Sequence, residues 1–64
     1  MNHMSRKHAH RADWMGNFSD KVILLDSRHA GRICWDTAAH YFNIGWGWQE
    51  AAYRYVEHRK ESAA

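Results

Sequence analysis

The stretch KVILLDSRHAGRICW, residues 21–35, decides which fold class the sequence favours. Lys21–Asp26 is rich in aliphatic and β-branched residues, a composition typical of a short buried strand. Ser27–Gly31 follows as a tight connection in which Gly31 can take a positive φ. Arg32–Trp35 then has the composition of a returning strand. The stretch therefore predicts a β-hairpin.

A helical interpretation of the same region stays open. Six residues fall on one helical stripe, so residues 20–42 could form a single long helix; they are Ile23, Ser27, Ala30, Cys34, Ala38 and Tyr41. The β-branched pair Val22–Ile23 and the central Gly31 argue against that helix. We favour the hairpin and keep an all-α helical hairpin or helix-turn-helix as the alternative.

The residues before this stretch suggest a further strand. Trp14 and Phe18 are β-formers, whereas Gly16, Asn17 and Asp20 disfavour a helix. We therefore expect a strand over Asp13–Phe18, which would complete a small antiparallel β-meander.

Residues 1–12 form a predicted basic arm that is rich in histidine and has no clear periodicity. Arg6, Lys7 and Arg11 place three positive charges there without an acid, whereas the rest of the chain is close to neutral. Such an arm suits nucleic acid or an acidic protein surface, and equally a solvated tail. We expect residues 13–64 to form one small domain.

The residues after Trp35 predict a short helix. Asp36 or Thr37 can cap it, because a side-chain oxygen there can accept the unpaired N–H groups of the first turn. We expect the helix over Ala38–Asn43, with Gly45 suited to its end.

A longer C-terminal helix is predicted from Trp48 to about Lys60. Its apolar residues recur at helical spacing; they are Trp48, Ala51, Ala52, Tyr55 and Val56. Glu50 precedes Arg54 by four residues, the favourable order for an ion pair. The sequence therefore predicts an α+β fold: a meander, a short helix and a longer C-terminal helix.

The sequence lacks the residues that several classes of function require. A single cysteine, Cys34, allows neither an intramolecular disulfide nor a zinc site built on cysteine pairs. The chain has no glycine-rich phosphate loop or nucleophile elbow, and 64 residues give little wall for a substrate pocket of several hundred Å³. We expect no enzyme, no cofactor and no metal site, and regard the copper-binding pattern Met1–Asn2–His3 as accidental.

Location and membrane association follow from the same composition. No apolar run approaches the roughly 20 residues that span a bilayer, and no apolar region follows the basic N-terminus as in a secretory signal. With one thiol and no such signal, we expect a cytoplasmic protein.

The aromatic residues predict a binding surface. Four Trp, three Tyr and two Phe exceed what a core of 64 residues can enclose. Trp46 lies between two glycines, where a bulky ring has little local support, and Trp, Tyr and Arg dominate binding hot spots. The predicted partner-binding residues are Trp46, Trp48, Glu50, Tyr53, Arg54 and Glu57. We expect a monomeric module that binds a protein.

The segment Thr37–Gly45, followed by a helix from about Gly47, resembles the helix-turn-helix unit of bacterial DNA-binding proteins. Ala39, Asn43 and Ile44 fall where that family has a small residue, a turn residue and a core aliphatic. The resemblance implies a small DNA-binding regulator, with possible nucleic-acid contacts from Arg6, Lys7, Arg11 and Gln49. Glu50 departs from the pattern, because an acid facing phosphate is costly.

In general character the chain is similar to the small, proline-free, aromatic-rich accessory proteins of phages, including inhibitors of CRISPR surveillance complexes. Size and the mixture of charge and aromatic residues carry this resemblance, and no motif does. It implies a stoichiometric inhibitor that docks on a host nucleic-acid-binding complex in the host cytoplasm.

Overall fold

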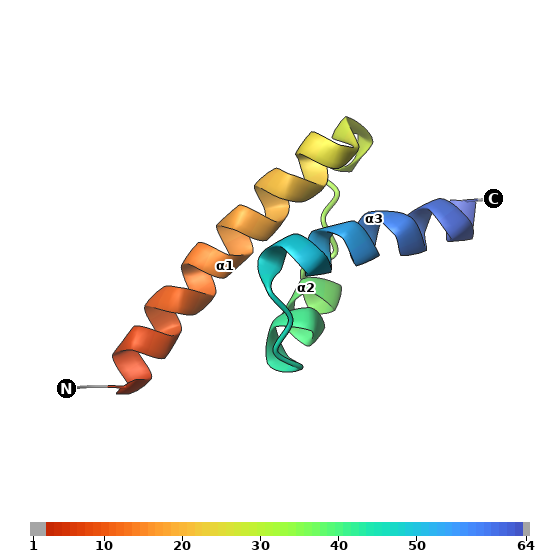
Figure 1. The fold of residues 1–64 in the computed structure, drawn as a ribbon. Helices are drawn as coiled ribbons and strands as arrows, with labels where there is room; N and C mark the ends of the chain where they lie inside the picture. Colours follow the sequence, from red (N-terminus) through yellow and green to blue (C-terminus); the bar gives the residue numbers. More distant parts are fainter. Residues whose placement is uncertain (1–2, 64) are drawn as a thin grey trace.

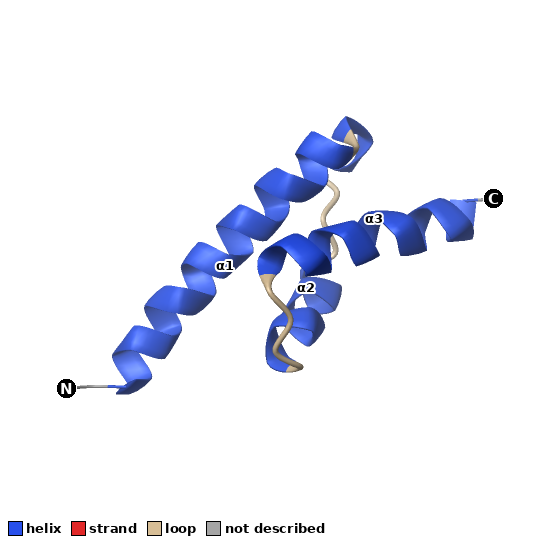
Figure 2. Cartoon of the chain, in the orientation of Figure 1, coloured by secondary structure: helices blue, strands red, loops and turns tan. Residues whose placement is uncertain are grey.

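Residues 3–63 form three α-helices and one turn of 3-10 helix. The structure is a computed structural model that describes the backbone of residues 3–63 and the side chains of residues 10–60. The elements are α1 (His3–Leu25), η1 (Ser27–His29), α2 (Trp35–Asn43) and α3 (Trp48–Ala63). No strand occurs in residues 3–63 (Figure 2). The predicted α+β fold with a β-meander is therefore wrong.

Helix α1 occupies the region where two strands were predicted, Asp13–Phe18 and Lys21–Asp26. Trp14, Phe18 and Val22 recur every four residues and are buried to 3%, 0% and 0% exposure. Burial of a continuous apolar stripe stabilises this helix. That stabilisation is larger than the cost of placing residues of low helix propensity in it. The residues that disfavour a helix, Gly16, Asn17 and Asp20, lie on its exposed face.

The connection after α1 rules out the single helix over residues 20–42. The carboxylate of Asp26 accepts a hydrogen bond from the backbone N–H of Arg28 at 3.1 Å and so caps η1. Gly31 has the predicted positive φ, 73°. Residues 32–34 have no regular structure and Trp35 begins α2, so the predicted strand Arg32–Trp35 is also wrong.

The two C-terminal helices are confirmed, each longer than predicted. Helix α2 begins after Cys34 instead of after Asp36 or Thr37. It ends in a Schellman motif: the N–H of Gly45, at φ 95°, donates to Phe42 O at 3.1 Å, and the N–H of Trp46 donates to Tyr41 O at 3.2 Å.

Helices α2 and α3 pack against the middle and the C-terminal part of α1, and the N-terminal turns of α1 extend beyond them (Figure 1). The most extensive interface between helices is that of α1 with α3. Ala51 and Ala52 are fully buried on α3, and their small side chains leave room for the rings of α1. Phe18 meets Tyr55 edge to face, with ring centroids 5.4 Å apart.

Two hydrogen bonds link elements that are distant in sequence. Trp14 Nε1 donates to the carbonyl oxygen of Trp46 at 2.9 Å, which joins α1 to the α2–α3 turn. The backbone N–H of Cys34 donates to the hydroxyl oxygen of Tyr55 at 3.0 Å, which joins the start of α2 to α3. These bonds satisfy polar groups that the aromatic core would otherwise desolvate.

Within residues 3–63, no helix is both long and apolar enough to cross a lipid bilayer.

Candidate functional site: a groove between α2 and α3

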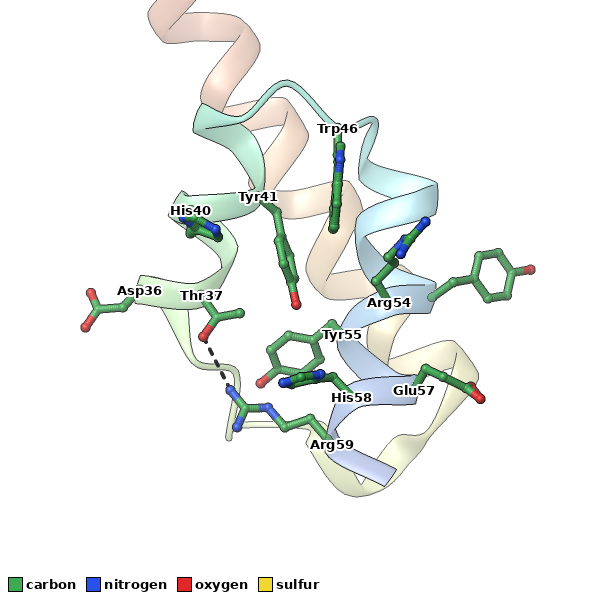
Figure 3. A pocket seen from close by; sticks show the side chains of 11 residues that line it. Asp36, Thr37, His40, Tyr41, Trp46, Arg54, Tyr55, Glu57, His58 and Arg59 are labelled. Carbon is green, nitrogen blue, oxygen red and sulfur yellow. Dashed lines mark hydrogen bonds between the residues drawn. The ribbon is translucent and has the colours of Figure 1, made fainter. Parts of the chain in front are cut away.

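An open groove of about 1000 Å³ lies between α2 and α3 (Figure 3). We call it the α2–α3 groove; it is lined by Asp36, Thr37, His40, Tyr41, Trp46, Tyr53, Arg54, Tyr55, Glu57, His58 and Arg59. The volume is an open groove and not an enclosed pocket, so it does not conflict with the expectation that 64 residues give little wall for a substrate pocket.

Trp46 closes one end of this groove and has more support than its flanking glycines suggest. The Schellman motif places its ring against that of Tyr41, stacked with centroids 4.9 Å apart and planes 23° from parallel. The guanidinium carbon of Arg54 lies 4.9 Å from the Trp46 ring centroid. Figure 3 shows Trp46 between these two side chains. Trp46 is half-buried, so it combines a role in packing with a place on the groove surface.

Arg54 is held by two partners on α3 and in the adjoining turn. Besides the Trp46 ring, it pairs with Glu50, whose Oε2 lies 3.1 Å from Arg54 Nη2. This pair confirms the predicted interaction four residues apart. Because both side chains are more than half exposed, the pair contributes little to stability. Its effect on the groove is that Arg54 already has a carboxylate partner.

Arg59 lies at the other end of the groove, in a different environment. Its guanidinium carbon is 4.7 Å from the centroid of the buried Tyr55 ring. Its Nη2 donates to the Thr37 hydroxyl oxygen across the groove at 3.5 Å, the dashed line in Figure 3. Arg59 itself is half-buried, and none of the ion pairs among residues 10–60 includes it.

Thr37 also contacts the thiol of Cys34 beside the groove. The Thr37 hydroxyl donates to Cys34 Sγ at 3.2 Å. Hydrogen bonding from Thr37, with a smaller contribution from the nearby Arg59 guanidinium, lowers the pKa of the Cys34 thiol from its ordinary value. No histidine side chain among residues 10–60 hydrogen-bonds to this sulfur, so the described part of the chain shows no cysteine–histidine pair.

The predicted partner-binding residues divide between the groove and its surroundings. Four of them line the groove: Trp46, Tyr53, Arg54 and Glu57. Glu50 lies outside it as the partner of Arg54. Trp48 is half-buried and packs against the core. Tyr53 is 54% exposed and is also approached by Lys21, whose Nζ lies 5.3 Å from its ring centroid.

Of the predicted nucleic-acid contacts, the structure describes the side chains of Gln49 and Arg11. Gln49 is exposed on α3, whereas the guanidinium carbon of Arg11 lies 5.2 Å from the Phe42 ring centroid. The side chains of Arg6 and Lys7, and the pattern Met1–Asn2–His3, lie outside the residues whose side chains the structure describes.

Sequence reasoning missed most of the α2 wall and the far end of α3. The overlooked residues that line the groove are Asp36, Thr37, His40, Tyr41, Tyr55, His58 and Arg59. The sequence spacing could have indicated two of these residues. Tyr55 and Arg59 are four residues apart on one helix, a spacing that brings a ring and a guanidinium together.

No group of three or more histidine, cysteine, aspartate or glutamate side chains that could hold a metal ion occurs among the residues that the structure describes. No protein-family model, curated protein or solved structure matches the chain.

Proposed function

We propose that this protein is a non-enzymatic interaction module that binds a protein partner through the α2–α3 groove. The observation that carries the proposal is the combination of rings and guanidinium groups along one open groove: Tyr41, Trp46, Tyr53, Arg54 and Arg59. Tyrosine, tryptophan and arginine contribute most strongly to protein–protein binding.

The helix-turn-helix alternative has less support from the fold. Ile44, which would be a core aliphatic in that family, is 49% exposed. The exposed face of α3, which would enter the DNA major groove, carries the acids Glu50 and Glu57 beside Arg54 and Lys60. A face of such balanced charge gains little from the phosphate backbone. The resemblance to inhibitors of CRISPR complexes, with a location in the host cytoplasm, stays a prediction about which partner the groove binds.

Affinity capture from cell lysate, with the protein as bait, tests the proposal. The captured proteins are compared between variants of the bait. We expect His58→Ala, which shortens an exposed groove side chain, to reduce capture of specific proteins. The matched control is His10→Ala, because His10 is also exposed and lies outside the groove, on α1. Both variants must keep the helical circular dichroism of the parent. Binding through the groove would be contradicted if both variants lost capture equally, or if neither variant lost it.

A further inference from the structure

The guanidinium of Arg59 has more hydrogen-bond donors than the described chain uses. Arginine carries five N–H donors. Among the described residues, the Arg59 guanidinium interacts with the Thr37 hydroxyl, at the long distance of 3.5 Å, and with the nearby Cys34 thiol. A half-buried guanidinium with so few acceptors retains a strong capacity to bind an anion.

Arg59 is also held in place before any ligand arrives. Its position above the Tyr55 ring restricts the guanidinium, and Tyr55 is itself fixed by the core and by its hydrogen bond to Cys34. Binding therefore requires little further ordering of this side chain. Arg54 differs, because Glu50 already occupies it.

We propose that the α2–α3 groove binds an acidic peptide segment, with one carboxylate paired to Arg59 and a neighbouring apolar side chain against the rings of Tyr41 and Trp46. The inference rests on the proposed function, since it names the chemistry of the partner at the same groove. A carboxylate offers two oxygens that match the planar guanidinium. The stacked rings of Tyr41 and Trp46 provide the apolar surface at the opposite end.

The charges around the groove favour a peptide over nucleic acid. Asp36 and Glu57 stand on opposite walls and point away from the space between the helices (Figure 3). A continuous phosphate backbone would pass these acids as it left the groove, and repulsion would offset its attraction to Arg59. A short segment with a localised carboxylate can pair with Arg59 and avoid them.

The test is a titration of the ¹⁵N-labelled full chain by nuclear magnetic resonance. The probe is an end-capped hexapeptide that carries a single aspartate next to leucine. The comparison ligands are the same peptide with lysine in place of aspartate, and a single-stranded hexathymidylate. We expect the acidic peptide to shift the Arg59 Nε–Hε resonance and the backbone amides of Thr37 and Tyr41. The lysine peptide should leave them unchanged, and the oligonucleotide should bind more weakly than the acidic peptide.

Three variants separate a specific contact from general attraction to charge. Arg59→Gln should weaken binding of the acidic peptide about tenfold, as expected for loss of a charge-assisted bond. Arg59→Lys should recover part of the affinity, since it keeps the charge without the planar fork. The control Arg32→Gln removes the same charge from an exposed position outside the groove and should have an effect of less than about twofold.

Two results would overturn the inference. One is equal weakening by Arg59→Gln and Arg32→Gln, which would indicate general electrostatic attraction. The other is tighter binding of the oligonucleotide than of the acidic peptide at the groove. The proposed function is contradicted by a different result: equal capture of proteins by His58→Ala and His10→Ala. If they do differ while Arg59→Gln captures as the parent does, the groove binds a protein by another chemistry.

Discussion

The indole N–H of Trp14 donates a 2.9 Å hydrogen bond to the carbonyl oxygen of Trp46, 32 residues away. This bond fixes the α2–α3 turn against α1, and the same turn places the Trp46 ring at one end of the groove. The position of the groove thus depends on a residue of the core that does not line it.

Trp14→Phe tests this link. The substitution removes the donor, leaves the Trp46 carbonyl without this partner and reduces the buried volume. We expect a loss of about 1–3 kcal/mol in the free energy of unfolding, measured by urea denaturation. Trp35→Phe is the matched control, because Trp35 is 52% exposed and should change stability by less than about 0.5 kcal/mol. Equal effects from the two variants would show that the hydrogen bond is unimportant.

Two glycines should respond to alanine with opposite signs. Gly45 has a φ of 95° in the Schellman motif, so Gly45→Ala should destabilise the protein by about 1–2 kcal/mol. Gly16 lies in the exposed face of α1 and a Cβ there meets nothing within 4 Å, so Gly16→Ala should stabilise by about 0.5–1 kcal/mol. Thermal unfolding followed by circular dichroism measures both. A destabilising Gly16→Ala would contradict a continuous α1.

The sequence patterns predicted the C-terminal part of the fold better than the N-terminal part. The stripe of α3 was clear because its small and aromatic residues repeat without an interruption. In α1, by contrast, Gly16, Asn17 and Asp20 separate the core residues and lower the local helix propensity. Trp14, Phe18 and Val22 are buried in a core that α1 shares with α2 and α3. This tertiary packing stabilises the helix, and no local pattern shows it.

Four of the residues that line the groove were predicted as partner-binding residues: Trp46, Tyr53, Arg54 and Glu57. The prediction rested on the frequency of tryptophan, tyrosine and arginine in binding hot spots and did not include a groove. The α2 wall depends on how α2 meets α3, which no local pattern specifies. Trp46 was interpreted as an unsupported anchor, yet the Schellman motif stacks it on Tyr41. A substitution there would disturb the fold as well as the groove, so His58 and Arg59 are better positions for tests of binding.

The cap at Asp26 predicts a specific dependence of stability on pH. Hydrogen bonds from the Arg28 side chain and backbone hold the pKa of Asp26 well below its usual range. A carboxyl whose pKa is lowered on folding stabilises the protein above its unfolded pKa and loses that effect as the pH falls. Asp26→Asn should therefore lower the melting temperature at pH 7, and the difference from the parent should shrink below about pH 4. A difference that grows at low pH would contradict this role.

The thiol of Cys34 provides a second titration. Because the Thr37 hydroxyl donates to Sγ and favours the thiolate, Thr37→Val should raise the pKa of Cys34 toward its ordinary value. The pH profile of alkylation by iodoacetamide should then shift to higher pH. Thr37→Ser keeps the donor and should leave the profile near that of the parent. A shift to lower pH in Thr37→Val would show that Thr37 does not stabilise the thiolate.

Site-specific photo-cross-linking tests binding through the α2–α3 groove most directly. A p-benzoylphenylalanine in place of His58 lies on the groove, and one in place of Asn17 lies on the exposed face of α1, outside it. Both positions are exposed, so neither replacement should disturb the core. We predict that a partner captured from lysate forms a cross-link from position 58 and none from position 17. A cross-link from position 17 without one from position 58 would contradict the proposed site.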